Sequence, residues 1–389
     1  MKTFEEINEK IKKGKAVVVT AEEVIPLART KGIKAVAEKV DVVTSATFGP
    51  MCSSGVFLNF GHADPPIKMN RVLLNDVPAY AGLAAVDAYL GASSLSEKEG
   101  AFYGGGHVIE DLVARRRILL RAEGYKTDCY PLERIETVIT LDSINQAVLC
   151  NPRNAYQNYG AATNSSSRTL YTYMGPLLPR FGNVSYSTSS QLNPLINDPE
   201  YRTIGLGSRI FLGGGIGHII GEGTQHNPSQ IRDQNHIPLG PAATLAVKGD
   251  LKQMSQRYLR GARIKGYGVS LFVGIGVPIP ILDEAMAEAV SIDDEHIFTT
   301  IYDYGVPRRE KPSYGRVHYG LLRSGFVELD GRHVPTNPLS SYAMAREIAQ
   351  ILKEWISRGE FFLVKPIQPL PRNVTLMPMS QHIAEDIDS

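Results

Sequence analysis

A lone thiol in a Gly/Pro turn is the residue of this sequence best suited to do chemistry. Cys52 follows a predicted strand in the stretch FGPMCSSGVFLNFGHADPP, residues 48–66. The N–H and O–H groups of Ser53, Ser54 and Gly55 behind it are expected to hydrogen-bond a thiolate or a persulfide. A thiolate is the nucleophilic form of cysteine and a ligand for soft metals. Cys52 is therefore the candidate nucleophile, with the alternative that it is simply a buried free cysteine.

The two other cysteines lie in different local settings. Cys129, in GYKTDCYPLER, is close in sequence to Lys126 and Arg134, whose positive charge favours a thiolate. Cys150 ends DSINQAVLC, a predicted short helix that begins at Asp142, and the carbonyl end of a helix disfavours a thiolate. The spacing of the three matches no C-x-x-C zinc or redox motif. These settings are compatible with a functional Cys129 and favour a structural Cys150.

The composition is that of an ordinary globular protein and excludes several classes of function. Of 389 residues, 43% are hydrophobic and 21% charged, and 41 basic side chains nearly cancel 40 acidic ones. No net field therefore attracts nucleic acid. We find no signal peptide and no apolar run long enough to cross a membrane, so we expect a cytoplasmic protein with no membrane partner. Three cysteines, an odd number, favour reduced thiols.

Hydrophobic patterns predict both strands and helices. Residues 16–20 and 39–47 are β-branched runs separated by helical segments. Residues 75–91 read as a helix, with Asp76 as the N-cap and small or apolar side chains along its length. Apolar side chains at helical spacing over residues 348–356 predict a core-packed helix near the C-terminal end.

These elements predict an α/β or α+β fold, with a mixed sheet, flanking helices and glycine-rich active-site loops. No low-complexity linker divides the chain. We therefore expect one catalytic domain over residues 1–372, which two lobes could make up, and a polar tail over residues 373–389.

Two glycine clusters are candidate anion-binding loops. Gly104, Gly105 and Gly106 precede a helical pattern that ends at Gly124, and the free N–H groups of a helix start can hold a carboxylate or phosphate. A tight turn that needs positive φ explains the same glycines.

The second glycine cluster lies in RIFLGGGIGHIIGEGTQHNP and includes Gly213, Gly214 and Gly215. A dinucleotide-binding fingerprint would need a glycine where Ile220 lies, so we expect neither NAD nor flavin. The loop could still expose donors around Gln225 and His226, and a purely structural turn is the competing interpretation.

Several long segments, taken together and in order, resemble the homocysteine biosynthesis family, the L-aspartate semialdehyde sulfurtransferases of methanogens and anaerobic bacteria. They span residues 39–284 and read ATFGPMCSSGVFLNFGHADPPIKM, LNDVPAYAGLAAVDAYLGA, YGGGHVIEDL, RIFLGGGIGHIIGEGTQHNP, AVKGDLKQMS and GYGVSLFVGIGVPIPILDE. The resemblance implies reductive insertion of sulfur into L-aspartate semialdehyde to give L-homocysteine, with functional cysteines at Cys52 and Cys129. Some members also carry a C-terminal pair of CBS domains, which we do not expect here.

The reaction implied by the resemblance leaves two mechanisms open. A persulfide on Cys52, with Cys129 as the resolving thiol, would deliver sulfur from a sulfide or persulfide donor and leave a disulfide. Equally, both thiolates could ligate a metal or an iron–sulfur cluster that binds sulfide. In either case electrons must come from a partner, and family members are associated with a small ferredoxin-like iron–sulfur protein.

Two rival functions remain open at this point. A scaffold or carrier protein would hold a cluster or a persulfide without acting on the aldehyde. A nicotinamide-dependent oxidoreductase would bind its cofactor at the second glycine loop, which the failed fingerprint disfavours. The sequence is also compatible with a homo-oligomer.

Other side chains are candidates for proton transfer and substrate binding. His62 is the candidate proton shuttle during water loss, with a loop-capping role as the alternative. The substrate has a carboxylate and an ammonium group, which call for an arginine and an acid. The candidate substrate-binding residues are Asn59, Asp64, Asp76, Arg153, Arg168, Arg209, Gln225 and His226.

Overall fold

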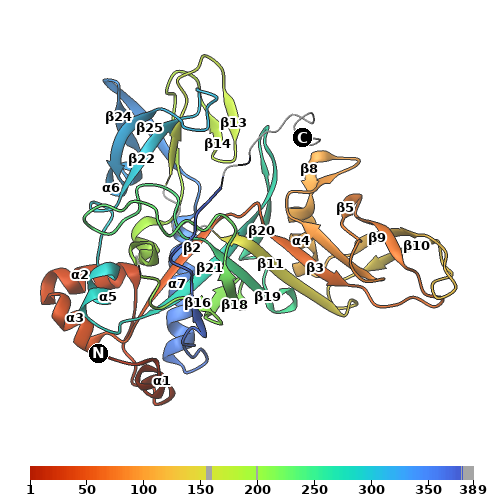
Figure 1. Cartoon of the computed structure of the whole chain (residues 1–389), viewed down its shortest axis with the longest axis horizontal. Helices are drawn as coiled ribbons and strands as arrows, with labels where there is room; N and C mark the ends of the chain where they lie inside the picture. The colour runs from red at the N-terminus through yellow and green to blue at the C-terminus, as the bar shows by residue number, and fades with distance from the viewer. Residues whose placement is uncertain (155–159, 199, 378, 380–389) are drawn as a thin grey trace, which may run out of the picture.

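A ten-stranded mixed sheet forms the centre of the molecule, seen in a computed structural model that describes residues 1–154, 160–198, 200–377 and 379 (Figure 1). In sheet order its strands are β1 (Val18–Thr20), β2 (Val42–Pro50), β21 (Gly268–Pro280), β17 (Arg209–Leu212), β18 (Gly215–Glu222), β19 (Leu245–Asp250), β11 (Gln146–Asn154), β3 (Gly55–Asn59) and β6 (Asp87–Gly91), while β20 (Leu259–Ile264) pairs with β21. The predicted mixed sheet with flanking helices is confirmed.

The longest strand pairing in this central sheet is the antiparallel pairing of β2 with β21. The pairing runs from Val42 opposite Pro280 to Pro50 opposite Phe272. Most of β2 is buried, as expected for a strand that is covered on both faces. Helix α7 (Tyr342–Ser357) packs on β2 and β21 (Figure 1). The pair therefore holds the residue that follows β2, Met51, in a fixed place.

Helix α7 confirms the helix predicted over residues 348–356. Ser341 caps it by accepting a hydrogen bond from the N–H of Met344. Its buried face recurs every three or four positions and comprises Ala345, Ile348, Ala349, Leu352 and Ile356.

The N-terminal helices complete the layer beside the sheet. β1 pairs in parallel with β2, and the chain between them forms α2 (Ala21–Lys31) and α3 (Ile33–Lys39), as the sequence predicted. Helices α1 (Phe4–Lys12) and α5 (Glu284–Val290) lie on the same side of the molecule (Figure 1). Among the helices of the described residues, none is long and apolar enough to span a membrane.

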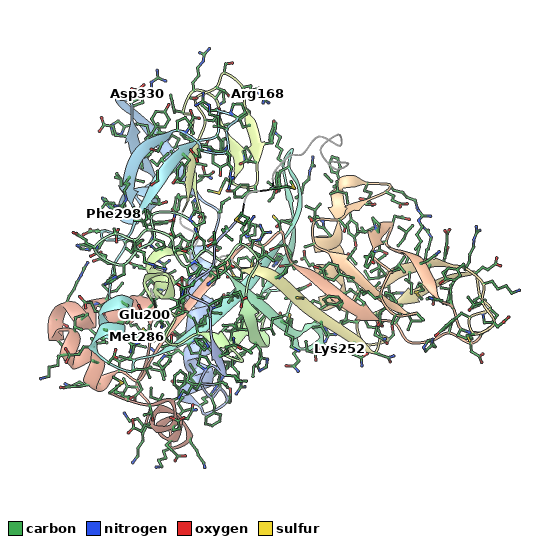
Figure 2. The ribbon with its side chains drawn as sticks, viewed as in Figure 1. Arg168, Glu200, Lys252, Met286, Phe298 and Asp330 are labelled. Carbon is green, nitrogen blue, oxygen red and sulfur yellow. The ribbon has the colours of Figure 1, made fainter. Side chains whose placement is uncertain are left out.

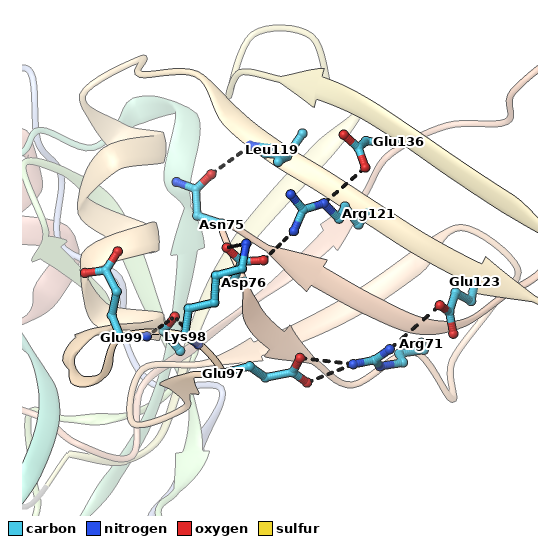
Figure 3. Close-up of polar contacts among 11 residues, drawn as sticks. Arg71, Asn75, Asp76, Glu97, Lys98, Glu99, Leu119, Arg121, Glu123 and Glu136 are labelled. Atoms are coloured by element: carbon cyan, nitrogen blue, oxygen red, sulfur yellow. Dashed lines mark hydrogen bonds and ion pairs between the residues drawn. The ribbon is translucent and has the colours of Figure 1, made fainter.

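A four-stranded sheet, here called the arm, extends from one side of the central sheet (Figure 1). Its strands are β10 (Arg134–Ile139), β9 (Ile118–Gly124), β4 (Met69–Leu74) and β5 (Val77–Ala79). Helix α4 (Gly105–Val113) and the β7–β8 hairpin (Leu95–Ser96, Gly100–Gly104) lie where the arm meets the central sheet (Figure 1). On the arm's surface, Arg71 bonds Glu97, and Arg121 bonds Asp76 and Glu136 (Figure 3).

A six-stranded sheet forms a further lobe above the central sheet (Figures 1 and 2). In order its strands are β23 (Ser313–His318), β22 (Phe298–Asp303), β12 (Ala161–Thr163), β15 (Val184–Tyr186), β25 (Arg332–Pro338) and β24 (Phe326–Leu329). The β13–β14 hairpin (Leu170–Thr172, Gly175–Leu177), α6 (Tyr319–Arg323) and the short helix η1 (Ser190–Leu192) accompany it. The remaining short elements are η2 (Pro194–Asn197), η3 (Leu251–Gln253), β16 (Gly205–Leu206) and β26 (Gln368–Pro369).

Two predicted helices are strands in the structure. Over residues 75–91 the chain instead forms β5 and β6, because Asn75 and Asp76, at φ of 49° and 62°, make the two-residue turn between β4 and β5. The segment that ends at Cys150 belongs to β11. Helix α4 begins at the predicted glycines, but it ends at Val113 rather than Gly124, which closes β9. Most of the predicted polar tail, residue 378 and residues 380–389, lies outside the described residues.

Candidate active site

Cys52 lies in the turn that carries the chain from β2 into β3. The N–H of Ser54 donates to the carbonyl of Met51 (3.0 Å), which closes the turn, and the N–H of Met51 donates to the carbonyl of Leu271 in β21 (2.8 Å). The Sγ atom of Cys52 is 3.0 Å from the Oγ atom of Ser270, which is fully buried in β21. The thiol is thus held between a turn and the central strand pair.

A cavity of about 620 Å³, here called the Cys52 cavity, opens beside this thiol. Its volume falls in the range of small-molecule sites. The described residues that line it come from β2 and its turn, β11, the β13–β14 hairpin, the segment after β15, the β18–β19 connection, the β20–β21 hairpin and the segment before α7. They are Thr47, Gly49, Pro50, Met51, Cys52, Ser53, Arg153, Asn154, Tyr173, Met174, Ser187, Thr188, Asn193, Gln225, Pro241, Thr244, Tyr267, Leu339 and Ser340.

The hydroxyl that reaches Cys52 is not one of those expected from the sequence. Ser53 Oγ instead donates to Asn151 Oδ1 and to the carbonyl of Arg153, both at 3.2 Å, and so ties the turn to β11. Ser54 Oγ is buried with no hydrogen-bond partner among the described residues. Ser270 gave no local signal, because a serine within a β-branched run reads as ordinary strand.

Arg153 and Gln225, both predicted from the sequence, come together on the cavity wall. Arg153 Nε donates to Thr224 Oγ1 (2.8 Å) and Nη1 donates to Gln225 Oε1 (3.0 Å). These two contacts fix the plane of the guanidinium. Arg153 is the charged side chain among the described residues that line the Cys52 cavity.

Tyr267 brings a phenol to the same cavity. It lies at the tip of the β20–β21 hairpin, where its N–H donates to the carbonyl of Ile264 (3.0 Å). Burial raises the pKa of Tyr267, and negative charge on Cys52 raises it further. The phenol therefore stays protonated at neutral pH and can act as a proton donor.

The two predicted histidines lie outside the lining of this cavity. His226 is buried: its Nδ1 accepts from the N–H of Thr244 (3.1 Å) and its Nε2 donates to the carbonyl of Pro371 (3.0 Å). Both ring nitrogens are thus committed to holding backbone segments together. His62 is exposed, and its ring stacks on that of Tyr130 with centroids 6.1 Å apart.

Cys129 lies in the loop that joins β9 to β10 at the outer end of the arm (Figure 1). The thiol is exposed. Its loop packs beyond the far end of β3, where the N–H of Leu132 donates to the carbonyl of Pro66 (3.3 Å). Cys52 precedes the near end of β3, and five extended residues span about 13 Å. The two thiols are thus separated beyond the Cα spacing of a disulfide, roughly 4.4–6.8 Å.

The remaining substrate-binding candidates lie outside the described lining of the cavity. Asp76 pairs with Lys98, which lowers the pKa of that carboxyl, and with Arg121 (Figure 3). The guanidinium of Arg209 lies 4.8 Å from the ring centroid of Phe361. The others are also placed away from the cavity lining: Asn59, which bonds Asp87 and Asn145; Asp64, which is exposed; and Arg168, which is exposed in the six-stranded lobe (Figure 2).

Comparison with known proteins matches residues 16–363 to the family described as homocysteine biosynthesis enzyme, sulfur-incorporation. The chain belongs to this family. A protein of Methanocaldococcus jannaschii named L-aspartate semialdehyde sulfurtransferase is 56% identical, over 96% of this chain and 74% of that protein. A protein of the same name from Methanosarcina acetivorans is 53% identical, over 98% of this chain and 74% of that protein. No solved structure gives a significant match.

Membership of the homocysteine biosynthesis family confirms the resemblance drawn from the sequence motifs. The matched region includes Cys52, Cys129 and Arg153. A more distant relative, an uncharacterized protein of Methanothermobacter thermautotrophicus, is 30% identical over 77% of this chain and 67% of that protein.

The glycine clusters of this family member serve close packing and a tight turn. The N–H groups of Gly105 and Gly106 donate to the carbonyls of Ser94 and Ala92, both at 2.8 Å, so they are not open to an anion. A Cβ atom at Gly105 would lie 1.9 Å from the carbonyl oxygen of Gly91. Gly213 and Gly214, at φ of 61° and 103°, form the two-residue turn between β17 and β18, and Gly215 begins β18.

The cysteines of the described residues do not fit an iron–sulfur cluster held within one chain. Such clusters need several thiolates around one centre. The part of the chain that the structure describes has no group of three or more His, Cys, Asp or Glu side chains placed to hold a metal. Cys150 lies in β11 rather than in the lining of the cavity, and burial raises the pKa of its thiol.

Proposed function

We propose that this protein inserts sulfur into L-aspartate semialdehyde at the Cys52 cavity and so forms L-homocysteine. Two relatives more than half identical to the chain carry the name L-aspartate semialdehyde sulfurtransferase. The structural observation that carries the proposal is a partly exposed thiol, Cys52, on the wall of a 620 Å³ cavity, bonded to a buried hydroxyl and close to one arginine.

The chemistry must replace the aldehyde oxygen with a thiol. Addition of sulfide to the carbonyl carbon and loss of water give a thioaldehyde, and two electrons with two protons reduce this to the thiol. Where the sulfur arrives as the outer atom of a Cys52 persulfide, cleavage of the sulfur–sulfur bond takes two further electrons and returns Cys52 as a thiolate. An external reductant supplies these electrons.

Two O–H groups support these steps. The Ser270 hydroxyl donates to the Cys52 sulfur when that sulfur is an anion, and charge-assisted hydrogen bonds of this kind are stronger than neutral ones. The Tyr267 phenol donates a proton to the oxygen that leaves as water. This proton donor takes the role that the sequence suggested for His62.

Arg153 binds the substrate carboxylate. Its guanidinium is oriented by Thr224 and Gln225 before the substrate arrives, so little freedom is lost on binding. A carboxylate held there keeps a small amino-acid aldehyde within the cavity that contains Cys52.

In this proposal the role of Cys129 differs from that of Cys52, because the Cys129 thiol is exposed at the end of the arm. It meets a sulfur donor, a reductant or the Cys52 of a second copy of the chain, rather than the Cys52 of its own chain. A ferredoxin-like iron–sulfur protein is the partner that we propose for delivery of electrons, and sulfide or a persulfide is the sulfur donor.

The test of this function is direct synthesis of homocysteine. Anaerobically purified, reduced protein is incubated with L-aspartate semialdehyde, sulfide and a low-potential chemical reductant, and homocysteine is measured by mass spectrometry. The wild-type protein should form it and Cys52→Ser should not, while Cys150→Ser should retain most of the activity. Homocysteine at the same rate without protein, or with Cys52→Ser, would contradict the proposal.

A sulfur carrier without aldehyde chemistry is the second candidate. It is favoured by the single cysteine in the described cavity lining, which is sufficient for a carrier. It predicts no homocysteine in that experiment, and an added sulfur on the Cys52 peptide when sulfide is supplied together with a two-electron oxidant and the reductant is left out.

A further inference from the structure

Thr188 lies on the wall of the Cys52 cavity in an unfavourable conformation. It follows β15 and has a φ of 66°. Positive φ is rare for a β-branched residue, because the branched side chain crowds the backbone there. Its Oγ1 atom is buried and has no hydrogen-bond partner among the described residues. Strain and an unpaired buried hydroxyl are both costs that cluster at ligand-binding sites.

The segment around Thr188 is held firmly by its neighbours. The N–H of Ser187 donates to the carbonyl of Gly160 (2.9 Å). Ser190, which also has positive φ (45°), is 3.1 Å from the hydroxyl of Tyr342 in α7 through its Oγ atom. The strained backbone of Thr188 is thus imposed by contacts on both sides.

The charges of the cavity leave one substrate group without a partner. Arg153 is a cation and attracts the carboxylate of an amino-acid substrate. No Asp or Glu occurs among the described residues that line the cavity, so the ammonium group must find neutral acceptor oxygens. A hydroxyl oxygen that makes no other hydrogen bond has two lone pairs to offer.

We propose that Thr188 binds the amino group of the amino-acid aldehyde and thereby selects α-amino aldehydes over aldehydes that lack this group. Binding requires that the Thr188 side chain turn to a staggered χ1 position in which Oγ1 faces the cavity and accepts from the ammonium group. This inference rests on the proposed function, since it assumes an amino-acid aldehyde as the substrate.

Ser189 provides a matched control next to Thr188. It is fully buried, and its Oγ atom also has no hydrogen-bond partner within the described part of the chain. Ser189 is not among the lining residues of the cavity. Ser189→Ala therefore removes a buried hydroxyl, as Thr188→Gly does, at a position outside the described lining of the cavity.

The experiment measures protection of Cys52 from alkylation, by mass spectrometry of its peptide, with two aldehydes as probes. L-aspartate semialdehyde has the amino group and succinate semialdehyde lacks it. In Thr188→Gly, the concentration of L-aspartate semialdehyde that halves the alkylation rate should rise about tenfold, the effect of a lost hydrogen bond to a charged group. The concentration of succinate semialdehyde that halves the alkylation rate should not change. Thr188→Ser, which keeps the hydroxyl, and Ser189→Ala should behave as wild type.

Stability provides an independent readout. Thr188→Gly removes the strain of positive φ, so its Tm should equal or exceed that of the wild type. Equal loss of protection for both aldehydes, or a lower Tm together with that loss, would assign Thr188 a purely structural role. Unchanged protection by L-aspartate semialdehyde would overturn the inference alone. Absence of protection in the wild type would overturn the proposed function with it.

Discussion

Cys52 and Ser270 are 218 positions apart in the chain, and their Sγ and Oγ atoms are 3.0 Å apart in the structure. The pairing of β2 with β21 brings them together, since Pro50 lies opposite Phe272 just before the turn. Ser270 is fully buried, so its hydroxyl has little freedom to bond elsewhere. The sheet thus delivers a fixed O–H group to the thiol that we assign to sulfur transfer.

Replacement of Ser270 by alanine should slow alkylation of Cys52 by iodoacetamide at neutral pH about tenfold. The reason is that a donated hydrogen bond favours the thiolate, which is the form that reacts. Ser45→Ala is the control, because Ser45 is equally buried in β2 but its Oγ donates to the carbonyl of Val277 (3.0 Å). If both variants slow alkylation equally, the hydroxyl of Ser270 has no specific effect on the thiol.

Arg153→Gln should raise KM for L-aspartate semialdehyde at least about tenfold, because a charge-assisted bond to the carboxylate is lost. The change in kcat should be smaller, since the group is distant from the reacting bond. Arg168→Gln removes an exposed arginine of the six-stranded lobe and should leave KM unchanged. Equal effects of the two substitutions would show that overall charge, rather than Arg153, governs binding.

The reactivity of Cys150 should depend on pH in a defined direction. Burial raises the pKa of this thiol, partly offset by the positive charge of Lys248. A raised thiol pKa means less thiolate at neutral pH than an ordinary cysteine has, so alkylation of folded Cys150 should stay slow until the pH rises into the alkaline range. Exposed Cys129 is the internal reference. Equal labelling of the two at neutral pH would contradict this prediction.

His226→Ala should lower the thermal stability of the protein, because the role of the His226 ring is structural. Its ring joins Thr244 to Pro371, and loss of both bonds leaves buried backbone groups unpaired, at a cost of about 1–3 kcal/mol. His62→Ala, at an exposed position, should leave Tm nearly unchanged. Thermal melts of the two variants decide this. A stable but inactive His62→Ala variant would restore the proton-transfer role predicted from the sequence.

Local signals in the sequence predicted local structure. Helix α7 could be predicted because its N-cap and apolar spacing lie within one segment, and the order of β1, α2, α3 and β2 could be predicted from alternating patterns. Residues 75–91 could not, because a two-residue turn and pairing with distant strands outweigh helix propensity there. The segment of Cys150 became a strand for the same reason.

The residues of the candidate active site also differ in whether the sequence could predict them. The turn that carries Cys52 could be proposed from sequence, and so could Arg153 near the end of β11 and Gln225 in the loop after β18. Ser270 and Thr188 could not, because their significance depends on a contact across the sheet and on a backbone conformation, neither of which leaves a local signal.

The central claim is that sulfur passes from Cys52 to the aldehyde carbon, and a single-turnover experiment with isotopically labelled sulfur tests it most directly. Protein is loaded anaerobically with labelled sulfide in the presence of an oxidant that allows persulfide formation, freed of excess label, and then mixed with L-aspartate semialdehyde and reductant. Mass spectrometry follows both the Cys52 peptide and the product. We predict that the label disappears from Cys52 as it appears in homocysteine, in equal amount. In a parallel sample that also receives unlabelled sulfide with the aldehyde and reductant, homocysteine that carries none of the Cys52 label would contradict the account.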